Sequence, residues 1–182
     1  DVPGQAGRQE PGDGRLTATS SLSLKHGFPP VADPTARVLV LGSMPGEASL
    51  RAGQYYANER NAFWRIMGDL LGAGPAMPYA QRLDRLKGAG IALWDVIAAC
   101  ERYGSLDSDI VNSSVCANDF SAFFEAHRSI RRVFFNGGAA ETTFRRHVLP
   151  QLSGVPLQLH RLPFYKCNRH FVHIFRYIFK CV

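Results

Sequence analysis

A glycine-rich turn and several polar side chains follow apolar segments of this sequence, and their types suit the binding of a polar ligand. The turn Gly42-Ser43-Met44-Pro45-Gly46 comes directly after one apolar run, and Asp95 and Asn136 end two others. The glycines and the proline preset a tight turn whose backbone N–H groups can point at a ligand's carbonyl oxygen. A carboxylate accepts hydrogen bonds, whereas an amide such as that of Asn61 donates and accepts them. These residues are the first candidates for a functional site.

Each candidate also has a purely structural interpretation. The segment 42–46 can be a plain strand-exit turn, and Asn61 can cap a helix because asparagine is a favoured N-cap residue. Asp95 can cap a turn or a helix, and Asn136 can hold the turn before the two glycines that follow it. The residue types alone leave both interpretations open.

Predicted strands alternate with predicted helices along the part of the chain that carries these residues. Short apolar runs predict strands over 37–41, 91–97, 133–135 and 155–162. Apolar residues at helical spacing predict helices over 61–71, 78–87, 119–127 (capped by Asn118 or Asp119) and 139–149, with long polar loops over 43–60 and 102–117. The alternation predicts an α/β fold, a three-layer α/β/α sandwich around a central, mostly parallel four-stranded sheet.

The carboxyl ends of parallel strands meet at one edge of a sheet, and ligands of open α/β folds bind beyond that edge. The loops that begin at Gly42, Asp95, Asn136 and Pro163 all leave such ends. We therefore expect the candidate residues to converge there.

Longer strings of residues resemble a known family. Gly42-Ser43-Met44-Pro45-Gly46-Glu47-Ala48-Ser49-Leu50 is followed by Gln54-Tyr55-Tyr56-Ala57 and Asn61-Ala62-Phe63-Trp64, and later by 90–96, 104–108 and 135–137. This set resembles the hypoxanthine-DNA glycosylase branch of the uracil-DNA glycosylase superfamily, over 26–163. The resemblance implies a uracil-DNA glycosylase-like fold and an enzyme that hydrolyses the N-glycosidic bond of hypoxanthine or uracil in DNA.

The resemblance implies a role for several positions. Met44 stands where the mismatch branch has its water-positioning asparagine, and a thioether cannot replace that amide. The hypoxanthine branch uses the asparagine of the N-x-F-W string instead, so Asn61 is the expected catalytic residue. An amide is too weak a base to remove a proton near neutral pH, but it can orient a water while preset donors stabilise the departing base. The expected base-binding residues are Gly42, Ser43, Met44, Pro45, Gly46, Tyr56, Phe63, Asp95 and Asn136.

Aromatic side chains near the loop 43–60 are candidates for stacking on an extruded base. Tyr55 and Tyr56 are adjacent and cannot both point the same way in an extended segment, so we assign the base to Tyr56 and DNA contact to Tyr55. Phe63 can share the platform or belong to the core of an amphipathic helix, where we place Trp64. The other expected DNA contacts are Ser105, Asp107, Ser108 and Lys166.

The two ends of the chain differ from this central domain. Residues 1–25 are poor in apolar residues and are expected to be disordered, 26–163 form the glycosylase-like domain, and 164–182 form an atypical tail. The tail lacks the Ser- and Pro-rich string that members of the superfamily carry after the fourth strand. It holds zinc-ligand types at Cys167, His170, His173 and Cys181, but the spacing matches no standard zinc module. We therefore expect neither metal nor cofactor.

Composition narrows the class of protein further. The net charge of +6 suits a polyanionic partner such as DNA. Four scattered cysteines and the absence of a secretory signal or a membrane-length apolar run favour an intracellular monomer with reduced thiols. Two alternatives stay open: a DNA-binding pseudoenzyme or truncated glycosylase without its DNA-insertion loop, and an unrelated nucleotide-binding α/β protein. The second lacks support because neither G-x-G-x-x-G nor a phosphate loop with Lys-Ser/Thr is present.

Overall fold

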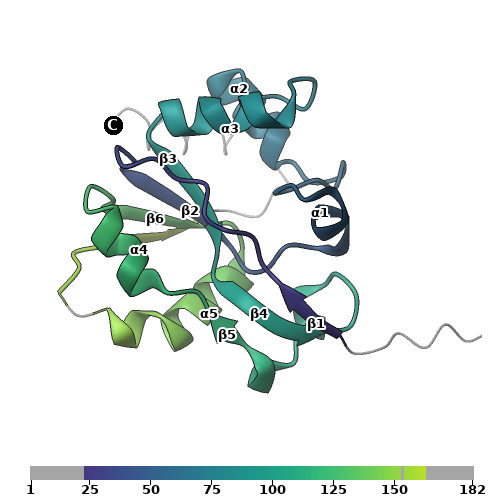
Figure 1. Cartoon of the computed structure of the whole chain (residues 1–182), viewed down its shortest axis with the longest axis vertical. Coiled ribbons are helices and arrows are strands. Elements are labelled where there is room, and N and C mark those ends of the chain that lie inside the picture. Colours follow the sequence, from purple (N-terminus) through teal and green to yellow (C-terminus); the bar gives the residue numbers. More distant parts are fainter. Residues whose placement is uncertain (1–22, 153, 163–182) are drawn as a thin grey trace, which may run out of the picture.

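A computed structural model describes residues 23–152 and 154–162, and its centre is a four-stranded parallel sheet (Figure 1). The tail 164–182, with Lys166 and the zinc-ligand types, lies outside the described residues. The strand order is β3-β2-β6-β7, and every neighbouring pair is parallel. The bounds are β2 (Val38–Gly42), β3 (Ile91–Asp95), β6 (Arg132–Phe135) and β7 (Gln158–Arg161). Each overlaps a predicted strand, so the predicted parallel sheet is confirmed.

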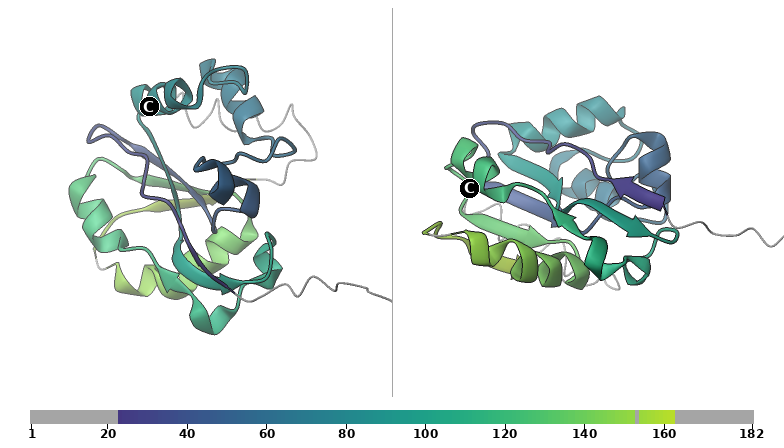
Figure 2. Two further views of the ribbon diagram at one scale, coloured as in Figure 1. Left: turned by 45° about the vertical axis from the view of Figure 1, so that its right-hand side comes forward. Right: turned by 60° about the horizontal axis from the view of Figure 1, so that its bottom comes forward.

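Helices cover both faces of the sheet, which gives the predicted three layers (Figures 1 and 2). On one face lie α2 (Phe63–Leu71) and α3 (Tyr79–Gly88), and on the other lie α4 (Phe120–Ala126) and α5 (Gly138–His147). Because successive side chains of a strand point to opposite faces, Val38 and Val40 pack under the first pair of helices, while Leu39 and Leu41 pack under the second pair. This is why β2 can be apolar along its whole length.

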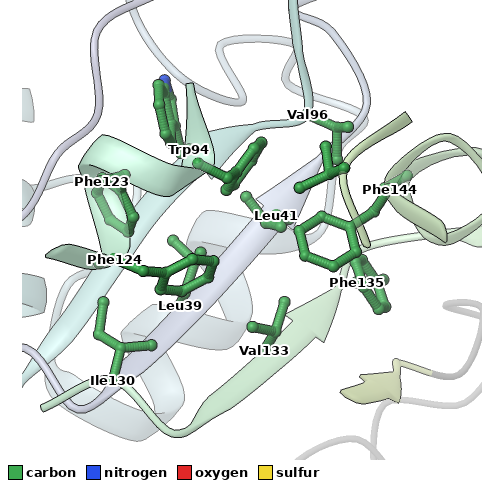
Figure 3. Packing of buried hydrophobic residues seen from close by; sticks show 14 of the residues in the cluster. Leu39, Leu41, Trp94, Val96, Phe123, Phe124, Ile130, Val133, Phe135 and Phe144 are labelled. Carbon is green, nitrogen blue, oxygen red and sulfur yellow. The ribbon is translucent and has the colours of Figure 1, made fainter. Parts of the chain in front are cut away.

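Aromatic rings fill the layer between the sheet and α4 and α5 (Figure 3). Phe144 of α5 meets Phe135 of β6 at 5.2 Å between ring centroids and Phe120 of α4 at 5.3 Å. Trp94 of β3 continues the cluster with Phe120 at 4.9 Å. One apolar cluster therefore joins β3, β6 and both helices on this face.

A second, antiparallel sheet was not predicted. Its strands are β1 (Ser23–His26), β4 (Ile97–Arg102) and β5 (Cys116–Ala117), in the order β1-β4-β5. The predicted single strand over 91–97 is wrong, because the chain leaves the parallel sheet after Asp95 and enters β4. At this corner the N–H groups of Val96 and Ile97 donate to the carbonyls of Gly42 and Ser43, at 2.9 and 3.0 Å.

Three other predicted segments need correction. The loop over 43–60 contains a short helix, α1 (Glu47–Ala52), which ends at Gly53 with φ of +62°. The loop over 102–117 contains two 3-10 turns and β5. The segment expected to be disordered up to Lys25 overlaps β1, whose Ser23 pairs with Arg102 of β4. Each of these elements is short and polar, so its hydrophobic period is too weak to predict it.

The helix start near Asn118 is confirmed, with Asp119 as the N-cap: its Oδ1 accepts a hydrogen bond from the Ala122 N–H at 2.9 Å. In the part of the chain that the structure describes, no helix has the length and apolarity that a membrane crossing needs.

Truncating Phe144 tests the aromatic cluster. Phe144 is fully buried between Phe120 and Phe135, so Phe144→Ala should lower the free energy of unfolding by about 3–5 kcal/mol in urea titration. Leu24→Ala is the matched control, because this leucine is 57% exposed, and its cost should stay within about 0.5 kcal/mol. Equal costs for the two variants would contradict the described core.

Candidate active site

A cavity of about 480 Å³ opens at the carboxyl edge of the parallel sheet. It lies where β2, β3 and β6 end. The chain passes from β2 to β3 on one side and later returns to β6 on the other side of β2, and such a reversal of strand order is the usual ligand position in open α/β sheets. The lining residues come from the ends of these strands, from α1, and from two loops far apart in the chain. Of the predicted site residues it contains Gly42, Ser43, Met44, Pro45, Gly46, Tyr55, Tyr56, Asn61, Asp95, Ser105, Asp107 and Asn136. Phe63 and Ser108 are not among them.

The first part of the wall is the turn after β2. A Cβ atom on Gly42 would lie 2.2 Å from Asp95 Oδ1 and 3.2 Å from the Tyr56 hydroxyl oxygen, so only glycine allows this approach. The carbonyls of Gly42 and Ser43 accept from the corner between β3 and β4, which fixes the turn against the sheet. The Met44 side chain is buried against Ile97 and serves packing.

A buried arginine, which the sequence did not single out, holds the same turn. Arg102 ends β4 and is 1% exposed. Its Nη2 donates to the Pro45 carbonyl at 2.6 Å and its Nε to the Gly104 carbonyl at 2.8 Å. Arg102 thus joins the turn after β2 to the loop after β4. A single basic residue at the end of a mostly apolar run carries no signal of this role.

The loop after β4 is bonded to the rest of the site by side chains. Ser43 Oγ donates to Asp107 Oδ1 at 2.5 Å, and Ser105 Oγ accepts from the Glu47 N–H at 3.0 Å. Ser105 and Asp107 were expected to contact DNA, but these atoms bind the protein and form part of the cavity wall. Ser108 lies outside the wall, and its hydroxyl donates to Asp109 Oδ1 at 3.2 Å.

Asn61 lies in the cavity wall and bonds to the backbone at the start of α2, although the N-cap residue of this helix is Ala62 and not Asn61. Its Oδ1 accepts from the Phe63 N–H at 2.9 Å at the start of α2, and its own N–H donates to the Asn58 carbonyl at 2.8 Å. An amide oxygen has two lone pairs and the amide nitrogen carries two hydrogens. The bond to Phe63 therefore fixes the side chain and still leaves capacity to hold a water.

Tyr56 presents the aromatic ring of the wall. It has φ of +55°, the one positive value among the non-glycine residues that the structure describes. Such a backbone is costly for a residue with a side chain, and it persists only where the surroundings impose it. The Tyr56 ring stacks on Phe63 with centroids 4.1 Å apart and an angle of 25° between planes. Phe63 is 2% exposed, so it supports the Tyr56 ring from behind and is not itself part of the base platform, which corrects that prediction.

Tyr55 belongs to the core, and the prediction that it contacts DNA is wrong. Its side chain is 3% exposed, and its hydroxyl donates to the Pro29 carbonyl at 3.1 Å. Its backbone is held on both sides, since the N–H donates to the Tyr79 hydroxyl at 2.9 Å and the carbonyl accepts from Trp64 Nε1 at 2.8 Å. Trp64 is buried in the core as predicted. This bonding fixes the residue that precedes Tyr56 in the chain.

Asp95 is a buried carboxyl group at the end of β3. It is 3% exposed, and among the described residues its Oδ2 has no hydrogen-bond partner. Burial, reinforced by the negative charge of Asp107 and opposed by the positive charge of Arg102, raises the pKa of Asp95 to about 7. Asn118 Nδ2 donates to the Asp95 backbone carbonyl at 2.8 Å, which leaves the carboxyl group to the cavity.

Asn136 and the charged residues complete the wall. The Asn136 N–H donates to the Leu41 carbonyl at 2.8 Å, which ties the end of β6 to β2. Besides its two tyrosines, the ionisable residues of the wall are Glu47, Arg51, Asp95 and Asp107, so carboxyl groups outnumber basic groups. Glu47 bonds to Lys25 Nζ at 2.9 Å, and this bond lowers the pKa of Glu47. The cavity suits a polar uncharged ring better than a phosphate group, which the carboxylates would repel.

Within 23–152 and 154–162, no three His, Cys, Asp or Glu side chains gather closely enough to hold a metal ion.

The titration of Asp95 predicts a pH dependence of stability. In the unfolded chain the carboxyl group ionises near pH 4, whereas in the folded protein it holds its proton up to about pH 7. The free energy of unfolding should therefore fall as the pH rises from 4 to 7, by about 1.4 kcal/mol per pH unit from this group alone. Asp95→Asn should remove this slope and be more stable than the wild type at pH 8, in urea titrations at several pH values. Asp69→Asn, at an exposed position of α2, is the control, and an equal change in both variants would contradict the burial of Asp95.

Comparisons with known proteins agree with this geometry. The family model described as "Uracil DNA glycosylase superfamily" matches residues 29–178, beyond Pro163, where the sequence motifs ended. A hypoxanthine DNA glycosylase from Methanosarcina acetivorans is 41% identical over 140 residues, which cover 72% of this chain and 87% of that protein. A hypoxanthine DNA glycosylase from Methanosarcina barkeri is 40% identical over 114 residues, which cover 62% of this chain and 71% of that protein.

A solved structure is also similar. The solution NMR structure of a candidate uracil DNA glycosylase from Methanosarcina acetivorans matches with a TM-score of 0.70 and 36% sequence identity, over 86% of this chain and 99% of that one. The resemblance inferred from the motifs is thereby confirmed. The family model covers most of the chain, and the solved structure shares its fold. This chain belongs to the uracil DNA glycosylase superfamily.

Proposed function

We propose that this protein is a monofunctional DNA glycosylase that removes deaminated bases, hypoxanthine first and uracil second, from DNA. The observation that carries the proposal is one cavity at the carboxyl edge of the sheet, where Tyr56, Asn61 and Asp95 converge beside a fixed turn. The two hypoxanthine DNA glycosylases to which the chain is similar support the choice of base. The net charge of +6 supports DNA as the partner.

The cavity offers complementary groups to a deaminated base. Hypoxanthine and uracil share a ring N–H next to a ring carbonyl. The Asp95 carboxyl group can accept from that N–H, and because its pKa is about 7 its protonated form can also donate to the neighbouring carbonyl. The Tyr56 ring supplies a flat surface for stacking, typically worth ~1–3 kcal/mol per base. The base must leave the DNA helix to reach these groups, so base extrusion is part of the proposal.

Hydrolysis then needs a positioned water and stabilisation of the leaving base. Breaking the N-glycosidic bond places positive charge on the sugar and negative charge on the base. Asn61, with its side chain fixed by the Phe63 N–H, orients the attacking water. Backbone N–H groups of the turn 42–46 are the candidate donors to the departing base, and the DNA phosphates favour the cationic sugar. Asn136 is the candidate for a second polar contact to the base edge.

The acidic residues of the cavity wall favour an uncharged base over a nucleotide as the ligand. Glu47 and Asp107 line the same cavity, and their charges would oppose a bound nucleoside phosphate. A base without its own charge meets no such opposition. The geometry therefore favours an extruded base over a free nucleotide.

Replacing Asn61 tests the catalytic assignment. Asn61→Ala should lower the single-turnover rate of base release from an inosine-containing duplex by at least ~100-fold, measured as alkali-sensitive strand cleavage. Because the Asn61 side chain also accepts a hydrogen bond from the Phe63 N–H, Asn61→Ala should destabilise the protein by about 0.5–1.5 kcal/mol.

Asn61→Ser is the matched control, since serine keeps an oxygen that can accept from the N–H two residues on and loses the amide. It should retain the stability of the wild type while remaining as slow as Asn61→Ala. Near-wild-type turnover in Asn61→Ala would exclude Asn61 as the catalytic residue. Recovery of the rate in Asn61→Ser would show that Asn61 acts only through its bond to the Phe63 N–H.

A further inference from the structure

Two helices bond to the backbone directly before Tyr56. Tyr79 begins α3, and its hydroxyl accepts from the Tyr55 N–H at 2.9 Å. Trp64 of α2 donates from Nε1 to the Tyr55 carbonyl at 2.8 Å. That carbonyl belongs to the planar peptide group that joins Tyr55 to Tyr56, and the φ angle of Tyr56 is a rotation relative to this plane. The two bonds therefore fix the plane from which the direction of the Tyr56 side chain is set.

A third helix bonds to the backbone directly after Tyr56. Ser49 of α1 is 6% exposed, and its Oγ accepts from the Ala57 N–H at 3.2 Å. The Ser49 carbonyl also accepts from the Gln54 N–H at 3.1 Å, so α1 bonds to the chain on both sides of the two tyrosines. Three side chains from three helices thus hold the backbone around one residue. We call them the backbone clamp: Ser49, Trp64 and Tyr79.

Two members of the backbone clamp are themselves held by contacts outside the cavity. The rings of Trp64 and Tyr79 meet edge to face, with centroids 5.9 Å apart and planes at 88°. The central guanidinium carbon of Arg82 lies 4.7 Å from the Trp64 ring centroid and 5.2 Å from that of Tyr79. A cation is attracted to the face of an aromatic ring, so Arg82 stabilises this pair. These three residues do not line the cavity, and they act on Tyr56 from behind its wall.

The left-handed backbone of Tyr56 needs such a restraint. At φ of +55° the Cβ atom of an L residue crowds its own backbone, and a residue relaxes to negative φ unless its surroundings prevent it. That relaxation would turn the side chain away from its present direction, in which the ring stacks on Phe63 beside the cavity. The place of the stacking surface therefore depends on a backbone conformation that the tyrosine by itself disfavours.

We propose that Ser49, Trp64 and Tyr79 are positioning residues, which hold Tyr56 in its left-handed conformation so that its ring is placed to stack on a base in the cavity. The proposal rests on the proposed function, since it concerns the base-stacking surface of the same site. The competing explanation is that the stack on Phe63, with centroids 4.1 Å apart, holds the Tyr56 ring without the backbone clamp. The two explanations differ in what the loss of one clamp hydroxyl does.

Removing single oxygen atoms from the backbone clamp separates the two explanations. Tyr79→Phe and Ser49→Ala each delete one acceptor, on opposite sides of Tyr56. Each variant should bind a duplex that carries uncleavable 2′-fluoro-2′-deoxyinosine ~5- to 10-fold more weakly than the wild type does. Binding to a duplex with a tetrahydrofuran abasic analogue, which has no base to stack, should stay within ~2-fold of the wild type. Equal weakening on both duplexes, or no weakening on either, would overturn the proposal.

Tyr55→Phe is the matched control. It deletes a buried tyrosine hydroxyl that bonds to the Pro29 carbonyl, but it keeps both backbone bonds of residue 55, so both affinities should stay unchanged. A double-mutant cycle supplies the second control. In a Tyr56→Ala background there is no ring to position, so Tyr79→Phe should cause no further loss of affinity for the fluoroinosine duplex. A further loss of the same size would show that Tyr79 acts by another route and would overturn the proposal.

The conformation of Tyr56 can also be measured without DNA. At φ near that of Tyr56 the amide hydrogen lies closer to the Hα of the same residue than at negative φ. The NOE between these two hydrogens of Tyr56 should therefore be strong in the wild type and in Tyr55→Phe, and weaker in Tyr79→Phe and Ser49→Ala. An unchanged NOE in both clamp variants would overturn the proposal. Should the wild type bind the fluoroinosine duplex no better than an undamaged duplex, the proposed function is rejected, and the NOE alone then decides whether the backbone clamp holds Tyr56.

Discussion

The close approach of the ends of β2 and β3 is the constraint on which the site depends. The two strands run parallel with Gly42 paired to Asp95, and the missing side chain of Gly42 leaves room for the carboxyl group in the space that a Cβ would occupy. The same contact removes Asp95 from water, and this burial is the main cause of its raised pKa. A parallel sheet with its hydrophobic faces covered by helices is rigid enough to maintain such a contact. The raised pKa of Asp95 in the cavity thus depends on the register between β2 and β3.

The antiparallel sheet helps to hold the loops at the edge of the parallel sheet. After Asp95 the chain turns out of the parallel sheet into β4, which ends at the buried Arg102. The guanidinium group bonds to carbonyls of two separate loops, so the turn after β2 and the loop after β4 form one wall. On the other side of the cavity the backbone of Tyr55 is bonded to Tyr79 and Trp64, directly before the strained Tyr56. Both walls are positioned by groups that lie outside the cavity itself.

The elements with strong periodic patterns were predictable, and those without were not. The parallel strands and α2 to α5 are apolar at regular spacing because each buries a face against a neighbour. The strand β1 and the corner after Asp95 form through bonds to distant segments, and the helix α1 is short, so their own residues carry little periodicity. For the site, the sequence motifs correctly predicted that Asn61, Asp95 and the turn 42–46 lie together at the carboxyl edge of the sheet. They could not assign the adjacent tyrosines, because which ring is buried depends on partners such as Pro29 and Phe63.

By itself, the sequence determined the class of fold, the edge of the sheet at which the site lies, and membership of the uracil DNA glycosylase superfamily. Hydrophobic period and short motifs encode these properties locally, in consecutive residues. Only the tertiary structure decided that Tyr55 is core while Tyr56 faces the cavity, and that Arg102 holds two loops. Burial, exposure and the pKa of Asp95 arise from contacts between segments that are tens of residues apart, and no local pattern records which of those segments will meet.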